Sequence, residues 1–259
     1  MIRKYSWIQD TKDKRDFKFS VDRETKVETV MLFDTKNTPP IYDQLDIGSC
    51  AENSVAAAEQ FLLMNKPGAT PNPTAKLFFP SRLFLYWWTR YYQGTLNEDS
   101  GSSIRTVVKA SAVNGVSDEE KWAYSHANLF KKPSDKAIEQ ALKFQALNYY
   151  RVPQTKRGII AALKSGHPVV FGMNVYESFQ SNEVAADGIV PIPDYHNEQY
   201  LGGHSMLIVG YKKEGDYFLV RNSWGKSWGI NGYCRIPASY LLNPSEASDF
   251  WVISQIELG

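Results

Sequence analysis

Three residues whose side chains could catalyse acyl transfer, Cys50, His204 and Asn222, lie at the ends of apolar segments. Cys50 precedes an Ala-rich run, residues 51–63, whose apolar residues recur at helical spacing without Gly or Pro. This pattern predicts an amphipathic helix that begins at Ser49 or Cys50. The partial positive charge of a helix N-terminus stabilises a thiolate and lowers the pKa of a cysteine from its ordinary value of about 8.5. A lone free cysteine is otherwise more often a small buried apolar residue.

His204 and Asn222 lie on two segments that predict neighbouring strands. His204 begins an apolar run that continues to Tyr211, and a second run from Tyr217 ends on Asn222. A hairpin of these two runs would bring His204 and Asn222 side by side. A thiol, an imidazole and a group that orients the imidazole are the parts needed for nucleophilic attack on an amide.

The same segments carry longer motifs. Gln44 lies six residues before Cys50 in Gly-Ser-Cys, Gly203-His204 leads into an apolar run that ends in Gly-Tyr, and residues 222–233 are N-S-W-G-K-S-W-G-I-N-G-Y. In these motifs the chain resembles the papain-like cysteine peptidases, over roughly residues 35–255. Ile47 stands where the family has a cysteine, Ala51 where it has an aromatic residue and Leu45 where it has a glycine, which predicts a divergent bacterial or viral branch.

The resemblance implies a role for each residue of these motifs. Cys50 would be the thiolate nucleophile, paired with a protonated His204 that Asn222 orients. The side-chain amide of Gln44 and the backbone N–H of Cys50 would form the oxyanion hole. Trp224 would either shield the His204–Asn222 hydrogen bond from water or fill the core at the hairpin end.

The resemblance also implies a peptide-binding cleft bordered by small residues. A pocket lined by Gly172, Gly202 and Ser205 would accept a bulky apolar side chain of the substrate. Ser100-Gly101 replaces a Gly-Gly pair of the family, so Gly101 would still present its backbone to a peptide. The predicted substrate-binding residues are Gly48, Ser49, Gly101, Gly172, Gly202, Gly203, Ser205 and Trp224.

The positions of the expected elements predict an α+β fold of two lobes. Residues 39–144 would form a helical lobe that carries Cys50, and residues 145–259 an antiparallel, β-barrel-like lobe that carries His204 and Asn222, with the cleft between them. Further helices are expected at 81–92, 104–113 and 155–165, and further strands at 146–152, 168–175, 232–236 and 250–253, with a Pro-rich loop at 66–73. The aromatic residues at 84–92 predict core packing rather than a stacking platform for bases or sugars.

Two segments outside these elements have more than one interpretation. Residues 1–38 form a short N-terminal extension, in which residues 1–25 would either lie in the cleft and inhibit the enzyme or pack on the surface as an arm. The spacing from Cys50 to His204 exceeds the roughly 130–150 residues typical of the papain type, which predicts an inserted polar loop at 180–199 beside the cleft. His196, Asp194 and Glu198 in this loop could be proposed as metal ligands, but we expect them to be solvated.

The composition and net charge of the chain indicate which classes of molecule it could bind. The chain has 259 residues, 43% hydrophobic and 22% charged, and a net charge of +1. No basic patch for nucleic acid or an anionic membrane is evident, which favours peptide or protein substrates without a metal or cofactor. With only two cysteines and no apolar leader, we expect no disulfide and a cytoplasmic or other reducing compartment.

Several functions share the same set of residues. An endopeptidase is the first expectation, and an isopeptidase, exopeptidase or acyltransferase would use the same triad. A binding module without catalysis and a purely structural protein are the contrasting classes.

Overall fold

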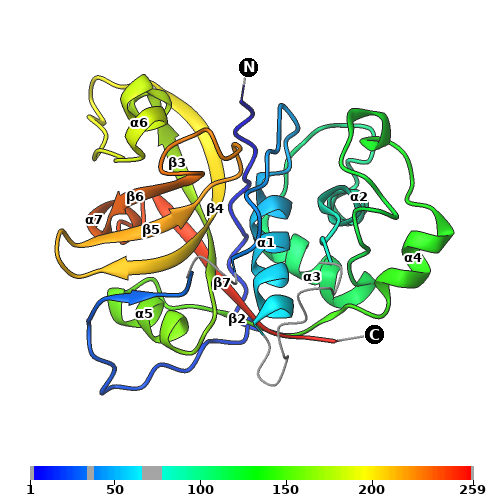
Figure 1. Ribbon diagram of the computed structural model, residues 1–259, viewed down its shortest axis with the longest axis horizontal. Coiled ribbons are helices and arrows are strands. Elements are labelled where there is room, and N and C mark those ends of the chain that lie inside the picture. Colours follow the sequence, from blue (N-terminus) through cyan, green and yellow to red (C-terminus); the bar gives the residue numbers. More distant parts are fainter. Residues whose placement is uncertain (1–2, 34–37, 66–77, 258–259) are drawn as a thin grey trace.

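The computed structural model describes residues 3–33, 38–65 and 78–257, so the predicted Pro-rich loop at 66–73 lies outside the described residues. Helices gather on one side of the molecule and a sheet on the other, and the N-terminal segment runs between them (Figure 1). The expected α+β architecture is therefore confirmed.

Among the described residues, the helical side has four α-helices, and the caps predicted for two of them are present. The Ser81 hydroxyl accepts the Phe84 N–H at the start of the second helix, and Gly115 follows the end of the third, both as expected. A fourth helix was not predicted because its seven residues contain too short an apolar pattern. These elements are α1 (Cys50–Met64), α2 (Arg82–Gln93), α3 (Ile104–Asn114), the short 3₁₀ turn η1 (His126–Asn128) and α4 (Asp135–Ala141).

The sheet side follows the predicted strands. Its strands pair antiparallel in the order β2-β7-β3-β4-β5-β6, and β1 pairs with β4 off this path. The strands are β1 (Val30–Met31), β2 (Ala146–Arg151), β3 (Val169–Tyr176), β4 (Tyr200–Lys212), β5 (Tyr217–Arg221), β6 (Tyr233–Pro237) and β7 (Ala247–Ile256). Helices α5 (Lys156–Lys164) and α7 (Ala238–Leu241) accompany them. In the described part of the chain β2 and β6 remain the two edges, so the sheet is not closed and the expected barrel-like closure is wrong.

The segment at 180–199 is more ordered than the predicted polar loop. It contains α6 (Asn182–Asp187), which follows the 3₁₀ turn η2 (Glu177–Gln180). Ser181 caps α6 through the Val184 N–H, and Gly188 ends it in the left-handed region. The side chain of Val184 is buried and anchors this helix on the core of the sheet side.

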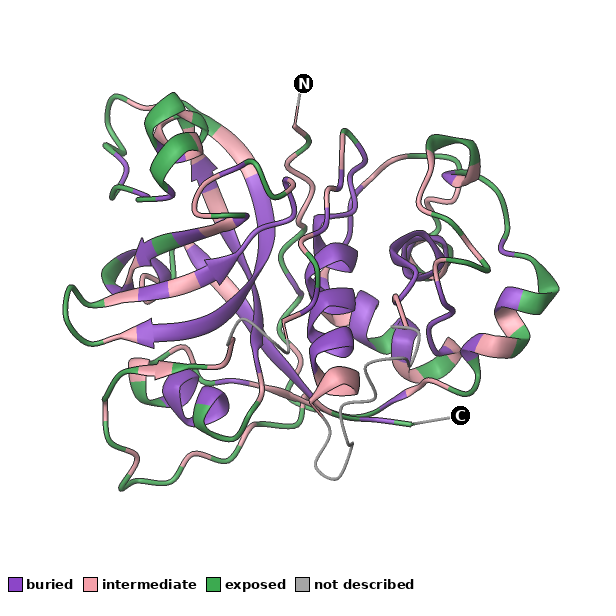
Figure 2. Cartoon of the chain, viewed as in Figure 1, coloured by how far each residue is buried: buried purple, intermediate pink, exposed green. Residues whose placement is uncertain are grey.

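Helix α1 is buried on every side, so its predicted amphipathic character is wrong. All residues from Cys50 to Phe61 are buried, including Glu52 and Glu59 (Figure 2). The helix packs against β4 and β7 on one side and against α2 and α3 on the other. Because α1 packs against both the helices and the sheet, its first residue, Cys50, lies where the two sides meet.

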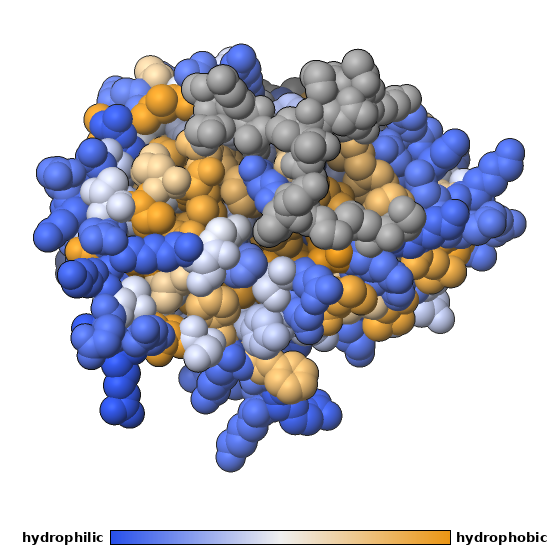
Figure 3. All heavy atoms as spheres, turned by 60° about the horizontal axis from the view of Figure 1, so that its bottom comes forward, coloured by the Kyte–Doolittle hydropathy of each residue, from blue (hydrophilic) through white to orange (hydrophobic). Residues whose placement is uncertain are grey.

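The aromatic run of α2 is mainly core, as predicted. Phe84, Tyr86 and Trp87 are buried, while Tyr91 and Tyr92 at the end of the helix are exposed. Figure 3 shows a face of the molecule on which charged and polar residues surround smaller groups of hydrophobic residues. Among the described helices, none is long and apolar enough to cross a bilayer.

Candidate active site

Cys50 lies at the first position of α1, as predicted. Because the first N–H groups of a helix have no intrahelical acceptor, the backbone N–H of Cys50 is available to a ligand. The thiol is buried, and its sulfur lies 3.6 Å from the hydroxyl oxygen of Ser6. Burial raises the pKa of the Cys50 thiol, and hydrogen bonds from Ser6 and from the backbone of Ser205 offset this only in part.

His204 and Asn222 meet across the β4–β5 pair. The His204 Nε2–H donates to Asn222 Oδ1 over 2.9 Å, and both residues are buried. The other ring nitrogen, Nδ1, is buried and has no hydrogen-bond partner among the described residues. Burial lowers the pKa of His204 to about 4, with Asn222 opposing this and Arg3 adding to it. The imidazole is therefore neutral at physiological pH.

The lobes bring the cysteine and the histidine together through α1 and β4. Four residues after Cys50, the Ser54 hydroxyl hydrogen-bonds over 2.8 Å to the hydroxyl of Ser205, which directly follows His204. Because Nδ1 is without a partner, the thiol and the imidazole are not hydrogen-bonded to each other in this structure. The Ser6 hydroxyl, rather than the imidazole, contacts the sulfur, so the expected thiolate–imidazolium pair is not formed in this structure.

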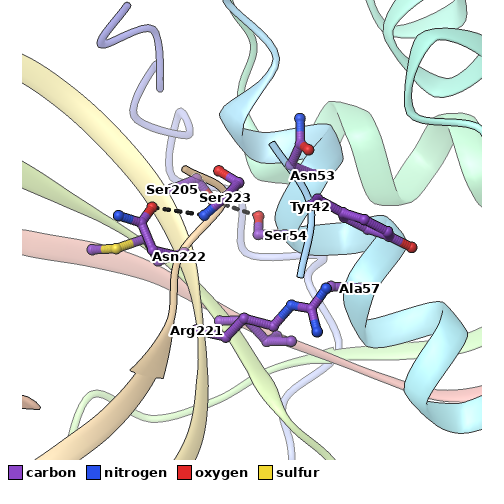
Figure 4. Close-up of a pocket in the computed structure, with 10 residues that line it drawn as sticks. Tyr42, Asn53, Ser54, Ala57, Ser205, Arg221, Asn222 and Ser223 are labelled. Carbon is purple, nitrogen blue, oxygen red and sulfur yellow. Dashed lines mark hydrogen bonds between the residues drawn. The ribbon is translucent and has the colours of Figure 1, made fainter. Parts of the chain in front are cut away.

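A small cavity lies beside this contact, between α1, the middle of β4 and the end of β5 (Figure 4). The side chain of Ser205 points into the interface with Ser54, and Arg221 lines the same cavity, its guanidinium donating to the carbonyls of Pro39 and Pro40. The hydroxyl of Ser205, predicted to line a substrate pocket, is thus engaged between the lobes. The cavity is lined by Tyr42, Asn53, Ser54, Ala57, Ser205, Met206, Leu207, Arg221, Asn222 and Ser223.

Gln44 is fully buried and is held from two directions. Its Oε1 accepts the Ser223 hydroxyl over 2.7 Å, and its Nε2 donates to the Ile47 carbonyl over 3.2 Å. A side-chain amide has two N–H groups, so one of them remains for a ligand. The next residue, Leu45, has a φ of 56°, a left-handed conformation that explains why a glycine would suit this position.

Trp224 forms part of an aromatic enclosure around His204. Its ring centroid lies 5.1 Å from that of the imidazole, and Phe179 and Tyr5 present their edges at 6.4 Å and 6.0 Å. Trp224 is only 3% exposed. This packing covers the imidazole, and Trp224 also belongs to the hydrophobic core, so its position fits both of its predicted roles.

The predicted glycines adjoin residues 5–7 of the N-terminal segment 3–19, which we call the strap. A Cβ at Gly172 would overlap the Trp7 ring at 1.9 Å, and one at Gly101 would overlap the Ser6 carbonyl oxygen at the same distance. A Cβ at Gly202 would come within 2.6 Å of Tyr5, and one at Gly203 within 2.6 Å of Trp7. At Gly48 the Asp99 carboxylate is nearest, at 2.9 Å, and the Ser6 hydroxyl oxygen follows at 3.2 Å.

The strap pairs with both walls of the cleft through its backbone. The Trp7 N–H donates to the Gly203 carbonyl over 2.9 Å on the β side. On the helical side, the Ile8 N–H donates to the Ser102 carbonyl over 3.0 Å and the Ser102 N–H to the Ser6 carbonyl over 3.1 Å. The strap therefore crosses Cys50 as an extended peptide between the lobes (Figure 1).

Ser49 and Asp99 complete the wall near Cys50. The Ser49 hydroxyl is 2.7 Å from the Tyr124 hydroxyl, so its side chain supports the loop rather than facing the strap. Both carboxylate oxygens of Asp99 accept the Gly48 N–H, at 2.9 Å and 3.1 Å, and one accepts the Tyr86 hydroxyl. Sequence reasoning missed Asp99 and Ser6, because only the folded chain brings them to Cys50.

No group of three or more potential metal ligands occurs in the part of the chain that the structure describes. Within the 180–199 segment, Asp194 accepts hydrogen bonds from the His196 backbone and the Asn197 amide. Both cysteines, Cys50 and Cys234, are buried and free.

Comparison with known proteins gives one family. The model of the papain family of cysteine proteases matches residues 95–243. An uncharacterised peptidase C1-like protein of Acanthamoeba polyphaga mimivirus is 35% identical over 98% of this chain and 88% of its own length. Human cathepsin L2 is 27% identical over 76% of this chain and 56% of its own length.

The crystal structure of xylellain, a cysteine protease from Xylella fastidiosa, superposes with a TM-score of 0.86 at 34% identity, covering 98% of this chain and 96% of that one. Digestive procathepsin L 3 of Tenebrio molitor shares the fold, with a TM-score of 0.67 at 18% identity over 90% of this chain and 73% of that one. The expected viral or bacterial kinship is confirmed. The chain belongs to the papain family of cysteine proteases and is a hydrolase of that family.

Proposed function

We propose that this protease is an endopeptidase that works through a thioester on Cys50. The observation that carries the proposal is the extended strap, which crosses Cys50 with His204 fixed by Asn222 beside it. Residues 3–5 of the strap lie on one side of Cys50 and residues 7–9 on the other, so the cleft accepts chain on both sides. A cleft open in both directions favours cleavage inside a chain over removal of terminal residues.

The mechanism begins when substrate replaces the strap. Nδ1 of His204 takes the proton of the Cys50 thiol, and the thiolate attacks the carbonyl carbon of the scissile amide. The oxyanion accepts hydrogen bonds from the free N–H of Gln44 Nε2 and from the Cys50 backbone, a contribution of about 3–4 kcal/mol per donor in a well-studied protease. The C–N bond then breaks while His204 returns the proton to the leaving amine, which leaves a thioester.

Hydrolysis of the thioester completes the cycle. His204 deprotonates a water, which attacks the thioester carbonyl. The C–S bond breaks, the acid product leaves, and the proton on His204 returns to the sulfur. Asn222 keeps the imidazole oriented through both steps without adding a negative charge beside the thiolate.

We also propose that the first 25 residues inhibit the enzyme by lying in the cleft. They belong to an N-terminal extension, residues 1–38, which precedes a helical lobe, residues 39–144, and a β-rich lobe, residues 145–259. The strap places the Ser6 hydroxyl, and not a carbonyl carbon, on the Cys50 sulfur, so it blocks the cleft without presenting a bond for attack. Trp7 fills the space over Gly172, which supports an apolar pocket there. When the strap leaves the cleft, water would enter and reduce the burial that keeps Cys50 and His204 neutral.

Turnover of internally quenched peptides, blocked at both ends, tests the proposal. We expect the wild-type chain to cleave inside these peptides and Cys50→Ala to abolish the cleavage while leaving the fold intact. Cleavage confined to peptides with free ends would favour an exopeptidase. Turnover of branched amides alone would favour an isopeptidase, and transfer to an added amine without hydrolysis an acyltransferase. Equal rates for wild type and Cys50→Ala would refute the proposed nucleophile.

A further inference from the structure

The loop that leads into Cys50, residues 44–49, connects the two donors of the proposed oxyanion hole. Gln44 at its start supplies the side-chain amide, and Cys50 directly after it supplies the backbone N–H. A turn lies between them, in which the Gln44 carbonyl accepts the Ile47 N–H over 3.2 Å and Leu45 has a φ of 56°. A leucine in this left-handed conformation is strained, and no disulfide holds the turn because both cysteines of the chain are free. Contacts with other segments therefore have to keep the turn in shape.

Tyr124, which lies 80 residues from Gln44 in the chain, contacts both ends of this loop. Its hydroxyl donates to the Gln44 carbonyl over 2.9 Å and lies 2.7 Å from the Ser49 hydroxyl oxygen. Because the one proton of the Tyr124 hydroxyl goes to Gln44, the Ser49 hydroxyl donates to the Tyr124 oxygen. Ser49 Oγ in turn accepts the Asn53 Nδ2–H over 3.1 Å. The hydrogen bonds thus run in one direction, from the first turn of α1 through Tyr124 to the oxyanion-hole residue.

The Tyr124 side chain is itself held in place. The Arg82 guanidinium lies over its ring, 3.7 Å from the centroid, and forms an ion pair with Glu119 over 2.6 Å. The same guanidinium donates to the carbonyl of Asp43, the residue before Gln44, over 3.1 Å. Burial raises the pKa of Tyr124, so its hydroxyl keeps the proton and stays a donor. Tyr124 is therefore fixed against the loop before any substrate binds.

We propose that Tyr124 is a positioning residue that holds the oxyanion hole of the enzyme in its working geometry. This inference rests on the proposed endopeptidase function. Without the Tyr124 hydroxyl the strained turn at Leu45 relaxes, and the Gln44 amide moves away from the point where it meets the oxyanion. Cys50 and His204 are placed by α1 and by the β4–β5 pair, so formation of the thiolate does not depend on Tyr124.

Two rates, measured on the same full-length protein, separate this role from a general effect on the fold. The first is kcat/KM for a blocked, internally quenched peptide, and the second is the alkylation of Cys50 by iodoacetamide at the same pH. Both need an open cleft and a thiolate, but only peptide cleavage passes through an oxyanion. We expect Tyr124→Phe to lower the ratio of the first rate to the second about tenfold, through kcat rather than KM. Loss of a whole oxyanion donor costs about 100- to 1,000-fold in kcat, and a displaced donor costs less.

Tyr211→Phe is the matched control. The buried Tyr211 hydroxyl also donates one hydrogen bond, to Asp216 over 2.6 Å, but it lies on β4 seven residues beyond His204. We expect this variant to keep the wild-type ratio. A second test adds Leu45→Gly to Tyr124→Phe. Because glycine adopts a positive φ without strain, the double variant should regain most of the lost ratio.

An unchanged ratio in Tyr124→Phe, or an equal fall in Tyr211→Phe, would overturn the inference. A double variant no better than Tyr124→Phe would overturn the role given to the turn. If Tyr124→Phe does not fold, Ser49→Ala decides instead, since it removes the next hydrogen bond of the same series. We then expect the ratio to fall about threefold, and an unchanged ratio would overturn the inference.

Failure of the proposed function gives a different result from failure of this inference. A wild-type chain that cleaves no peptide would refute the proposed function, and this inference with it. A wild-type chain that cleaves, together with a Tyr124→Phe variant of the same ratio, would refute this inference alone.

Discussion

Replacing Trp7 by alanine should open the cleft without disturbing the rest of the fold. The Trp7 ring lies on Gly172 and Gly203, so the substitution removes a packed aromatic contact of the strap with the β side. The backbone hydrogen bond from Trp7 to the Gly203 carbonyl does not depend on the side chain. The change therefore acts mainly on the equilibrium between docked and released strap.

The size of the effect follows from burial and from one unpaired polar atom. Truncating a fully buried Trp costs about 3–5 kcal/mol, and Trp7 is only partly buried. Its Nε1 is buried without a partner, and removing it recovers about 1 kcal/mol of desolvation. A net loss of about 2 kcal/mol would raise the released fraction about 30-fold.

Alkylation of Cys50 by iodoacetamide at pH 7, followed by mass spectrometry of the full-length chain, measures the released fraction. Phe17→Ala is the matched control, because Phe17 lies on the same segment but is 71% exposed. We expect Trp7→Ala to react about 30-fold faster than wild type and Phe17→Ala to react like wild type. Equal rates for all three, with unchanged circular dichroism, would refute a strap that shields Cys50.

Three further predictions concern charge and pH. Because burial raises the pKa of the Cys50 thiol while the strap is docked, the alkylation rate of wild type should reach its midpoint at a higher pH than that of Trp7→Ala; superimposed profiles over pH 5–10 would contradict this. Arg151→Met leaves Asp10 and Asp249 without their cation, although Asp16 keeps its ion pair with Arg105, and should lower the free energy of unfolding in urea by about 3 kcal/mol, whereas the exposed Arg15→Met should change nothing measurable. Burial raises the pKa of Glu59 to about 8, so the folded chain keeps a proton that the unfolded chain releases, and wild-type stability falls as the pH rises from about 4.5 to 8. Glu59→Gln should remove this loss and be about 4 kcal/mol more stable than wild type in urea at pH 8 but not at pH 4.5; a constant difference would count against it.

Local sequence signals were sufficient for most of the elements. The Ser81 cap, the glycine after α3 and the continuous apolar run of β3 depend on neighbours a few residues away, so the predicted helices and strands appear where they were expected. The errors concern longer-range packing. Helix α1 was expected to have a polar face, but its buried Glu52 and Glu59 find hydroxyl partners on other segments, Ser102 and Ser111.

The motifs placed the histidine beside its asparagine because a hairpin has a single register that keeps both runs on the sheet, and the structure has that pair at 2.9 Å. No local pattern indicates that Ser6 reaches the Cys50 sulfur or that Lys4 reaches Asp99, since these contacts join segments separated by a large part of the chain. The protonation state of the pair is likewise decided by tertiary packing, because the strap and both lobes exclude the water that would stabilise two charges. The sequence by itself thus determined the residues that can react, and the folded chain determined what covers them.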